Sequence, residues 1–353
     1  MSGALRVLHA PYEVAGQGMM LAKGLRENGC EAKSLTYQVA WDGRRPDVIV
    51  DLGRVPGGAL GRLPVQIATF IRHASEYDVF HLHFGRSFLP RLWDVPLLKS
   101  RGATVVFHFH GCEVRNRAHM LTQHRLATCT ECDPFCVPSK QRAILEGAAK
   151  YADRCFFSTL DLAESVPGGV HLPLAIEWER WAEAGRVPLA DPMRRDGVHG
   201  PVVIAHAPYN RLIKGTQHII DAVERLKQEL PRIELRLVEH RPWAEMPAFI
   251  AGCDILVDQL FMGWYGLGAI EGMAEGRTVV TYIREDFRRV HPDLPIVSAE
   301  RDTIFEVLRD LVRDPARRQE LGERGRTFTR EHHDTRTVGG ILLRHYRELR
   351  GEA

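Results

Sequence analysis

Two cationic side chains stand in a short loop between an apolar strand and an amphipathic helix. Residues 205–223 read AHAPYNRLIKGTQHIIDAV, which places Asn210, Arg211 and Lys214 just before Gly215 and Thr216. A loop at a strand end that holds two cations and opens a helix is suited to bind an anion, because the first helical amides have no partners within the helix. Taken alone, the motif fits a solvated basic turn equally well.

A later stretch, residues 254–282, offers a complementary site. It reads as a buried strand at 254–258, a glycine-broken turn, a short helix and a second buried strand. Gly263 and Gly266 precede the helix, so its first amides can face an anion, while Glu271 lies about one turn further in and can grip hydroxyl groups. Phosphate at the helix start and ribose beside it describe a nucleotide-sugar, and this pairing favours the phosphate interpretation of the earlier loop.

Histidines alternate along two predicted strands, DVFHLHF and VVFHFHG. His81 with His83 and His108 with His110 are each two residues apart, which places each pair on one face of its strand. His110 ends its strand before a glycine and is the best candidate for a catalytic histidine, whereas the other three are expected to be packed or hydrogen-bonded within the sheet. His9 is ambiguous. Further polar residues follow strand ends and are candidates for acceptor binding: Glu13, Arg86, Glu113 and Arg115.

A cysteine cluster is the least expected feature of the sequence. Cys129 and Cys132 form a Cys-x-x-Cys half-site for tetrahedral zinc, and Cys136 can supply a third thiolate. The fourth ligand could be Cys112, His119 or His124, and an iron–sulfur cluster would use the same thiolates. The alternative is that these cysteines are buried packing residues. A catalytic metal is not expected, because four protein ligands leave no open position.

Composition excludes several classes of protein. A formal net charge of +2 across 353 residues, with Lys and Arg scattered among nearly as many acids, gives no case for a nucleic-acid partner. No apolar run approaches the ~18 residues that a spanning helix needs, and the N-terminus has no signal region, so we expect a cytoplasmic protein without a transmembrane segment. No basic amphipathic helix stands out near the N-terminus, which disfavours an acceptor held in a membrane.

The elements that must position these residues alternate between strands and helices. Such alternation predicts parallel sheets covered on both faces, in two domains because the chain is long for one core. Residues 1–174 form the first domain, 175–200 a linker, 201–334 the second domain and 335–353 a C-terminal helix that packs back on the first. Strands are expected at residues 5–10, 32–37, 47–50, 78–83, 104–109, 154–158, 202–206, 234–238, 254–258 and 277–282.

The pairing of KGTQHIIDAV with the later segment GLGAIEGMAEGRTVV resembles the donor half of retaining glycosyltransferases of the GT-B type, specifically family 4. The resemblance extends to VLRDLVRDPARRQELGERGRTF near the C-terminus and to AGQGMMLAKGLRENG and VVFHFHG in the first half. It implies an α/β fold of two Rossmann-like domains with a cleft between them. It also implies an enzyme that transfers a sugar from a nucleotide diphosphate, most commonly UDP, to a glycan or small-molecule acceptor.

Roles carried over from the family follow the same residues. The resemblance implies that Glu271 binds ribose, that Arg211 and Lys214 neutralise the diphosphate and that His110 contacts the donor sugar. It further implies that the turn at Gly16 lies under the reacting groups. The backbone from Gly266 through Leu267 to Gly268 would hold phosphate or sugar.

One position departs from the family pattern. The family has a second acid eight positions before the ribose glutamate, and here that position is Gly263, followed by Trp264. Asp258 and Gln259 could substitute, although Asp258 could instead cap the turn. His240, with Arg241 and Pro242, occupies the loop where a base would lie. Rival interpretations are an epimerase or phosphorylase on the same scaffold, and a non-catalytic sugar-nucleotide-binding or metal-stabilised protein.

Overall fold

In the computed structural model of the protein, every strand pairing among the described residues is parallel, as the sequence predicted. The structure describes residues 4–40, 42–132, 136–184 and 192–352. They fall into two units. Unit 1 comprises residues 1–116, 136–175 and 334–353, and unit 2 comprises residues 117–135 and 176–333. The prediction of an α/β fold with two parallel sheets is confirmed.

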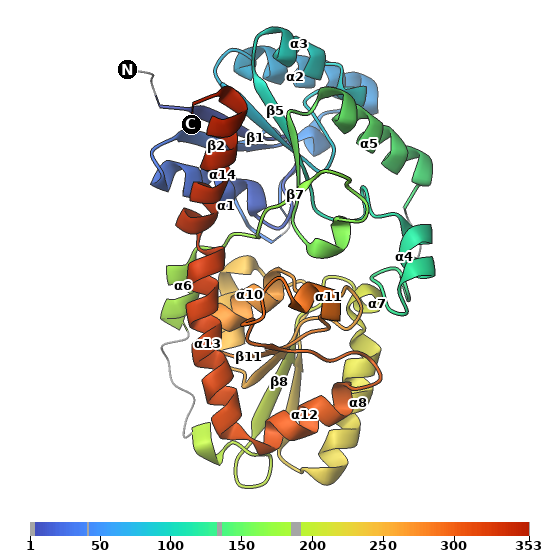
Figure 1. Ribbon diagram of the computed structural model, residues 1–353, viewed down its shortest axis with the longest axis vertical. Coiled ribbons are helices and arrows are strands. Elements are labelled where there is room, and N and C mark those ends of the chain that lie inside the picture. Colours follow the sequence, from blue (N-terminus) through green and yellow to red (C-terminus); the bar gives the residue numbers. More distant parts are fainter. Residues whose placement is uncertain (1–3, 41, 133–135, 185–191, 353) are drawn as a thin grey trace. The chain divides into compact units, whose positions relative to one another are not determined.

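Unit 1 is built, in its described part, on a seven-stranded sheet in the order β3-β2-β1-β4-β5-β6-β7 (Figure 1). The order reverses direction beside β1, so the carboxyl ends of β1 and β4 flank a switch point, where open α/β sheets place ligands. The strands are β1 (Arg6–Ala10), β2 (Glu31–Thr36), β3 (Val48–Ile49), β4 (Val79–His83), β5 (Thr104–Phe109), β6 (Arg154–Phe157) and β7 (Val170–His171). The helices are α1 (Gln17–Glu27), α2 (Gly58–His73), α3 (Val95–Ser100), α5 (Pro138–Tyr151) and α14 (Thr335–Arg350).

The last helix of the chain, α14, packs against α1 within unit 1. The two backbones cross at Gly24 and Gly339, where a Cβ on Gly339 would lie 2.3 Å from the carbonyl carbon of Gly24. Glycine is therefore required at this crossing. The close approach brings Val338, Leu342 and Tyr346 of α14 into the apolar core of the unit.

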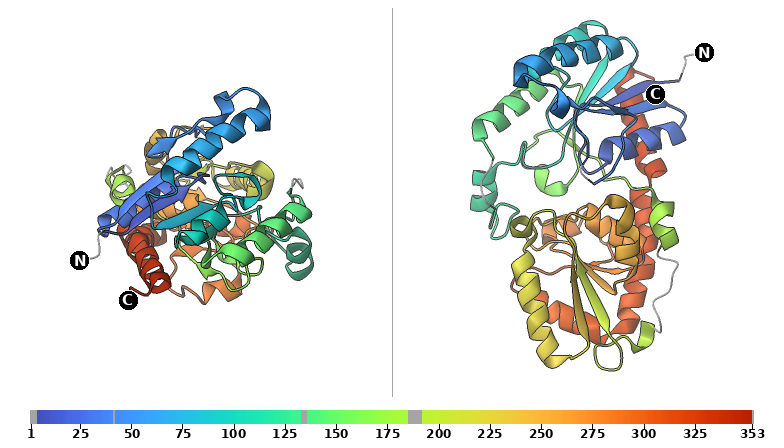
Figure 2. Two further views of the ribbon diagram at one scale, coloured as in Figure 1. Left: turned by 90° about the horizontal axis from the view of Figure 1, so that it is seen from above. Right: turned by 180° about the vertical axis from the view of Figure 1, so that it is seen from behind.

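Unit 2 has, among its described residues, a five-stranded sheet in the order β12-β11-β10-β8-β9. Figure 2 shows the same elements from two further directions. The strands are β8 (Val202–His206), β9 (Ile233–Leu237), β10 (Ile255–Val257), β11 (Thr278–Val280) and β12 (Ile296–Val297). The helices are α4 (Arg117–Gln123), α6 (Trp178–Ala184), α7 (Arg211–Lys214), α8 (Thr216–Glu229), α9 (Met246–Ala251), α10 (Leu267–Ala274), α11 (Glu285–Arg288), α12 (Ile304–Arg313) and α13 (Pro315–His333).

The core of unit 2 lies between its sheet and two helices. Ile204 of β8 and Ile255 of β10 are fully buried and belong to one apolar cluster with Val223 of α8 and Leu308 of α12. This packing holds the carboxyl ends of β8 and β10 in fixed register, with His206 beside Val257. The residues that follow these two strands are therefore neighbours.

The structure describes the predicted linker, residues 175–200, in part. Its described part contains α6, in which Trp181 is buried, whereas residues 185–191 lie outside the described residues. None of the helices in the described ranges has the length and the apolar character needed to cross a bilayer.

Candidate functional site

Lys214 and Asp258 form a buried ion pair at the carboxyl edge of the unit 2 sheet. The Nζ atom of Lys214 lies 2.6 Å from Oδ1 of Asp258, and the two side chains are 11% and 5% exposed. Lys214 ends α7, whose first turn is capped by Oδ1 of Asn210 accepting from the amide of Ile213 at 3.1 Å. Gly215, at φ 71°, then turns the chain directly into α8 at Thr216. The loop that the sequence predicted therefore directs the ammonium group of Lys214 into the protein interior.

Asp258 joins that cation to the start of α10. It follows β10, and its Oδ2 accepts a hydrogen bond of 3.1 Å from the amide of Gly266, the residue before the first turn of α10. A Cβ on Gly268 would lie 3.1 Å from Oδ1 of the same carboxylate. The backbone at Gly266, Leu267 and Gly268 thus packs closely around Asp258. In this structure a carboxylate occupies the helix start where an anionic group is stabilised.

Glu271 lies on α10 and is buried, with 6% of its surface exposed. Its position one turn beyond Gly266 places a carboxylate on the same short helix that receives Asp258. The cluster formed by Lys214, Asp258, the start of α10 and Glu271 is hereafter called the α10 site. It contains a cation, the carboxylate of Asp258 and backbone donors at the sheet edge, with Glu271 further along the same helix.

Arg211 lies apart from this cluster. Its Nε is 3.0 and 3.1 Å from the two carboxylate oxygens of Glu239, and its side chain is 53% exposed. The pairing with Glu239 raises the pKa of the Arg211 guanidinium. Exposed pairs of this kind contribute little stability, so the guanidinium can exchange partners at small cost.

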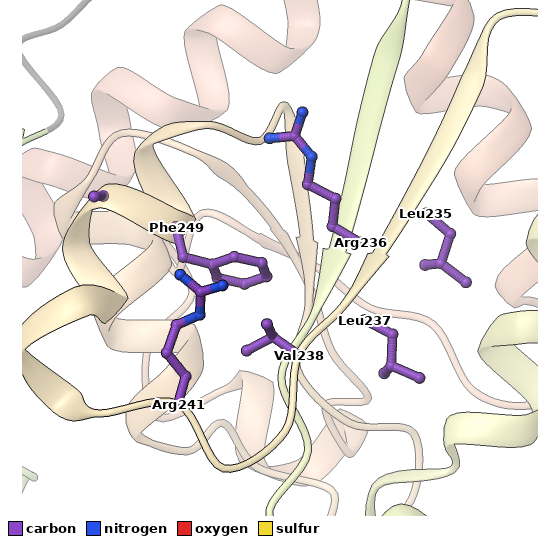
Figure 3. Close-up of a pocket in the computed structure, with 7 residues that line it drawn as sticks. Leu235, Arg236, Leu237, Val238, Arg241 and Phe249 are labelled. Atoms are coloured by element: carbon purple, nitrogen blue, oxygen red, sulfur yellow. The ribbon is translucent and has the colours of Figure 1, made fainter.

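The loop predicted to lie against a base follows β9. His240 is exposed and has a left-handed backbone, with φ of 53°. A pocket of about 490 Å³ lies beside this loop and is lined by Val238, Arg241 and Phe249 together with Leu235, Arg236, Leu237 and Ala248. Figure 3 shows the guanidinium of Arg241 next to the ring of Phe249, with its carbon 5.3 Å from the ring centroid. The pocket therefore combines an aromatic face with a cation.

Gly263 cannot be replaced by an acid without rearrangement. Its φ is 80°, and a Cβ there would lie 2.8 Å from Cδ of Arg284. Gln259 braces the same loop, because its Oε1 accepts from the amides of Phe261 and Met262 while its Nε2 donates to the carbonyl of Trp264. Gln259 is thus occupied by backbone groups. Of the two residues suggested as substitutes for the missing acid, Asp258 is the one whose carboxylate belongs to the α10 site.

His206, which the sequence did not single out, pins the loop that carries Lys214. Its Nδ1 donates to the carbonyl of Val257 at 2.8 Å, and its Nε2 lies 2.9 Å from Oγ1 of Thr216. Burial lowers the pKa of His206 to about 4, so the ring is neutral at physiological pH. A histidine that ends a buried strand is the only sequence signal that marks it.

Five histidines of unit 1 meet on one face of its sheet. Parallel register places His9 beside His81 and His83 beside His108, and the alternation along each strand adds His110. Six side-chain hydrogen bonds link these rings to two hydroxyls in one series. In order they join Tyr346 to His81 (2.6 Å), His81 to His108 (3.1 Å), His108 to Ser158 (3.0 Å), Ser158 to His110 (2.7 Å), His110 to His83 (2.9 Å) and His83 to His9 (3.1 Å). We call this series the histidine chain.

Every ring inside the histidine chain uses one nitrogen on each side, as neutral imidazoles can. Burial lowers the pKa of His83 to about 3 and holds the pKa values of the other four rings well below the usual range. His81, His83 and His108 are buried and hydrogen-bonded, as the sequence indicated. Both ring nitrogens of His110 are engaged as well, so a contact between His110 and a donor sugar stays a prediction.

The turn after β1 is also organised by a carboxylate. Gly16 has φ of 82° and precedes α1, while Oε1 of Glu13 accepts from the amide of Gly18 at 2.9 Å. Burial raises the pKa of Glu13 to about 7, although hydrogen bonds from backbone amides favour the carboxylate and act in the opposite direction. Glu113 accepts from the amide of His110, and Arg115 forms a buried ion pair of 2.7 Å with Asp161. These residues shape the loops at the sheet edge.

The four cysteines of the predicted metal cluster are divided between the units. Cys112 and Cys136 belong to unit 1, whereas Cys129 and Cys132 belong to unit 2. Within the described ranges, the side chains whose ligand atoms lie within 4.8 Å of one another are histidines of the chain above, in two groups that share His83. No such group of cysteines occurs there, and the cysteine site stays a prediction.

The architecture of the two sheets is that of GT-B glycosyltransferases. The chain is similar over 99% of its length to a sucrose-phosphate synthase from Thermosynechococcus elongatus, with a TM-score of 0.64, 17% identity and full coverage of that structure. Anabaena HepE in complex with UDP and glucose matches with a TM-score of 0.65 and 13% identity, covering 98% of this chain and 100% of HepE.

Epimerases share the same architecture. A putative UDP-N-acetylglucosamine 2-epimerase from Listeria monocytogenes gives a TM-score of 0.58 at 12% identity, with coverage of 99% of this chain and 98% of that one. No family model matches the sequence, and a search of curated proteins finds no match either. At these identities the similarity establishes the fold.

Proposed function

We propose that the protein is a retaining glycosyltransferase. It transfers a sugar from a nucleotide-diphosphate sugar, with UDP as the nucleotide, to a glycan or small-molecule acceptor. The observation that supports this most is the α10 site, where Lys214 reaches the start of a helix that also carries Glu271. The structures with the same fold include one described in complex with UDP and glucose and another with UDP-glucose.

The chemistry assigned to the α10 site is stabilisation of the departing diphosphate. When the bond between sugar and phosphate breaks, negative charge develops on the phosphate oxygens, and fixed cations and amides lower the barrier. Lys214 has three donors, so Nζ can keep Asp258 and direct another proton to a phosphate oxygen. Asp258 positions Lys214, Glu271 binds the ribose hydroxyls, and the loop at His240 faces the base.

The first test is nucleotide release. The protein is incubated with UDP-, GDP- and ADP-sugars, with and without acceptor extracts, and the released nucleotide is measured. We expect turnover with one base, and Lys214→Ala should reduce kcat by about 10²- to 10³-fold, as for loss of one fixed donor at a developing oxyanion. The matched control is Lys227→Ala on α8, where a partly exposed lysine pairs with Glu224. Equal turnover in both variants would remove Lys214 from the mechanism.

An epimerase is the second candidate, and the structural match to UDP-N-acetylglucosamine 2-epimerases favours it over other rivals. The two activities are separated by following UDP-N-acetylglucosamine in solution by NMR without acceptor. Appearance of the 2-epimer with the base retained supports the epimerase, whereas release of UDP supports transfer. Tight nucleotide binding with neither product would identify a sugar-nucleotide-binding protein.

A further inference from the structure

The turn that follows β4 has a strained backbone. Phe84 is left-handed, with φ of 58°, and Gly85 follows at φ of 61°. Bulky residues rarely adopt this conformation, because their Cβ atom approaches the following carbonyl oxygen. Two hydrogen bonds hold the turn: the amide of Phe84 donates to the carbonyl of His108 at 3.0 Å, and the amide of Arg86 donates to the carbonyl of His83 at 3.2 Å. Strain of this kind is concentrated at functional sites.

This turn lies beside the loop that follows β1, at the switch point of unit 1. Parallel register places Ala10 of β1 next to Leu82 of β4. Tyr12 comes two residues after Ala10, and Phe84 comes two residues after Leu82. The rings of Tyr12 and Phe84 stack, with centroids 4.9 Å apart and planes 19° apart. An aromatic pair therefore joins the two loops at the edge where open α/β sheets bind ligands.

Arg86 is held against this aromatic pair. Its Cζ atom lies 5.4 Å from the centroid of the Tyr12 ring, and the residue is exposed. Within the part of the chain that the structure describes, its guanidinium forms no ion pair with a carboxylate. The face of a ring attracts a guanidinium without taking up its five N–H donors. The side chain is thus oriented by Tyr12 while its donors stay available for a ligand.

The neighbouring charged groups of these loops are engaged within the protein. Oε1 of Glu13 accepts a hydrogen bond of 2.9 Å from the amide of Gly18. Arg44 forms an ion pair with Asp42, in which the two side chains are 10% and 12% exposed. Arg86, by contrast, presents its positive charge to solvent at the same edge. A negatively charged group is therefore the ligand that this edge favours.

We propose that Arg86 binds a phosphate or carboxylate group of the sugar acceptor, so that the acceptor is an anionic molecule. The planar fork of a guanidinium matches two oxygens of either group, which gives direction as well as affinity. Tyr12 is a positioning residue that acts through Arg86. This inference rests on the proposed function, because it narrows the acceptor of that reaction to one chemical class. It involves no residue of the α10 site.

The test is calorimetric titration of the full chain with glucose, glucose 6-phosphate and glucuronic acid, with UDP at saturation to fill the α10 site. Because the guanidinium contacts the anion and not the ring, at least one of the two anions should bind at least tenfold more tightly than glucose. The two anions distinguish a phosphate from a carboxylate. Arg86→Gln should reduce the affinity for the preferred anion about tenfold, as for the loss of a charge-assisted hydrogen bond.

Two further comparisons separate a specific contact from a general effect of charge. Arg72→Gln removes the same charge from an exposed position of α2 and should bind the preferred anion within twofold of the unchanged protein. Tyr12→Phe keeps the ring that orients Arg86 and should also bind within twofold. Tyr12→Leu removes the ring and should weaken binding of the anion severalfold, with the affinity for glucose unaltered.

Two outcomes overturn the proposal: neither anion binds more tightly than glucose, or Arg86→Gln and Arg72→Gln lose affinity equally. Circular dichroism and thermal midpoints of all four variants establish that the fold is kept. The result is distinguishable from failure of the proposed reaction. Binding of the anion without turnover of any nucleotide-sugar would remove the reaction and leave an anion site, whereas turnover with equal use of glucose and the two anions would keep the reaction and remove the role of Arg86.

Discussion

Lys214 and Asp258 determine each other's position, since each is nearly inaccessible to solvent and carries the charge that compensates the other. Removing one member leaves a buried unpaired charge, which typically costs about 3–5 kcal/mol, whereas replacing both by uncharged groups of similar size is often nearly neutral. The pair is thus a constraint on folding as well as a candidate for catalysis.

A double-mutant cycle separates these two roles. Lys214→Met and Asp258→Asn should each lower the free energy of unfolding of unit 2 by roughly 3–5 kcal/mol, and the double variant by less than their sum. Turnover should stay at the level of Lys214→Met in the double variant, because restored packing does not restore a cation. Denaturant titration and kcat are the measurements. Additive losses in stability would show that the two side chains do not interact.

The sequence identified both residues but could not reveal that they touch. The sequence predicts Lys214 in a diphosphate loop and Asp258 at the end of a buried strand, and it pairs these two segments without predicting an ion pair between the two side chains. Their contact depends on the register of β8 with β10, which sets Val257 beside His206. Likewise, the sequence suggested Gln259 for sugar binding. In the structure its side-chain amide is hydrogen-bonded to the carbonyl of Trp264 and the amide of Met262 in its own loop.

Among the elements, the long apolar strands were predictable, and the two-residue edge strand β3 also lies within its expected range, whereas β7 and β12 were not predicted. β5 matches its expected bounds, and β8 does so as well, because both are buried runs between clear turns. β7 and β12 have two residues each and carry too little pattern to be recognised. The α10 helix begins at Leu267, directly after Gly266, as expected from the glycines that precede it.

The crossing of α1 with α14 gives a prediction about a whole element. Gly339→Leu inserts a side chain where even a Cβ meets the backbone of Gly24. We expect α14 to be displaced, with a loss of several kcal/mol in stability of unit 1, as for overpacking that moves backbone. Arg344→Leu, which places a leucine at an exposed position of the same helix, is the control. Thermal unfolding and hydrogen exchange in α14 report the change, and protection like that of the control would contradict it.

For the whole molecule, buried titratable groups predict a stability maximum near neutral pH. Six buried histidines have lowered pKa values in the folded state, so the unfolded chain binds more protons below about pH 6.5 and stability is lost as the pH falls. Glu13 and Glu275 have pKa values raised to about 7 and about 8 in the folded state. The folded chain therefore holds more protons on these two groups, and stability is lost as the pH rises above the pKa that they have in the unfolded chain.

The histidines outnumber these carboxyls, and each proton difference changes stability by about 1.4 kcal/mol per pH unit. Thermal midpoints measured from pH 4.5 to 8.5 at constant ionic strength should therefore peak at about pH 6.5–7 and fall more steeply on the acidic side. His206→Asn, which removes one of the six groups, should make the acidic limb shallower. A midpoint that rises between pH 6 and pH 5 would be inconsistent with buried neutral histidines.

Solved structures that share only 11–17% sequence identity with this chain have the same fold, although no family model matches its sequence. The fold can therefore be predicted where the sequence itself matches no family. Parallel α/β units need apolar strands, glycine turns and helices with one apolar side, and many sequences meet these requirements. Specific substrates depend on a few side chains at strand ends, which vary independently of the fold. The acceptor belongs to that variable set.

The histidine chain has a collective property that none of its members has alone. Each neutral ring that donates from one nitrogen must accept at the other, so the direction of one hydrogen bond sets the direction of the next. Ser158 has a single hydroxyl proton, so at most one of His108 and His110 can accept from it, and this couples His110 through His108 and His81 to Tyr346 on α14. Replacing Ser158 with alanine would divide this ordering into two independent halves, leaving the tautomer of His110 governed by His83 alone.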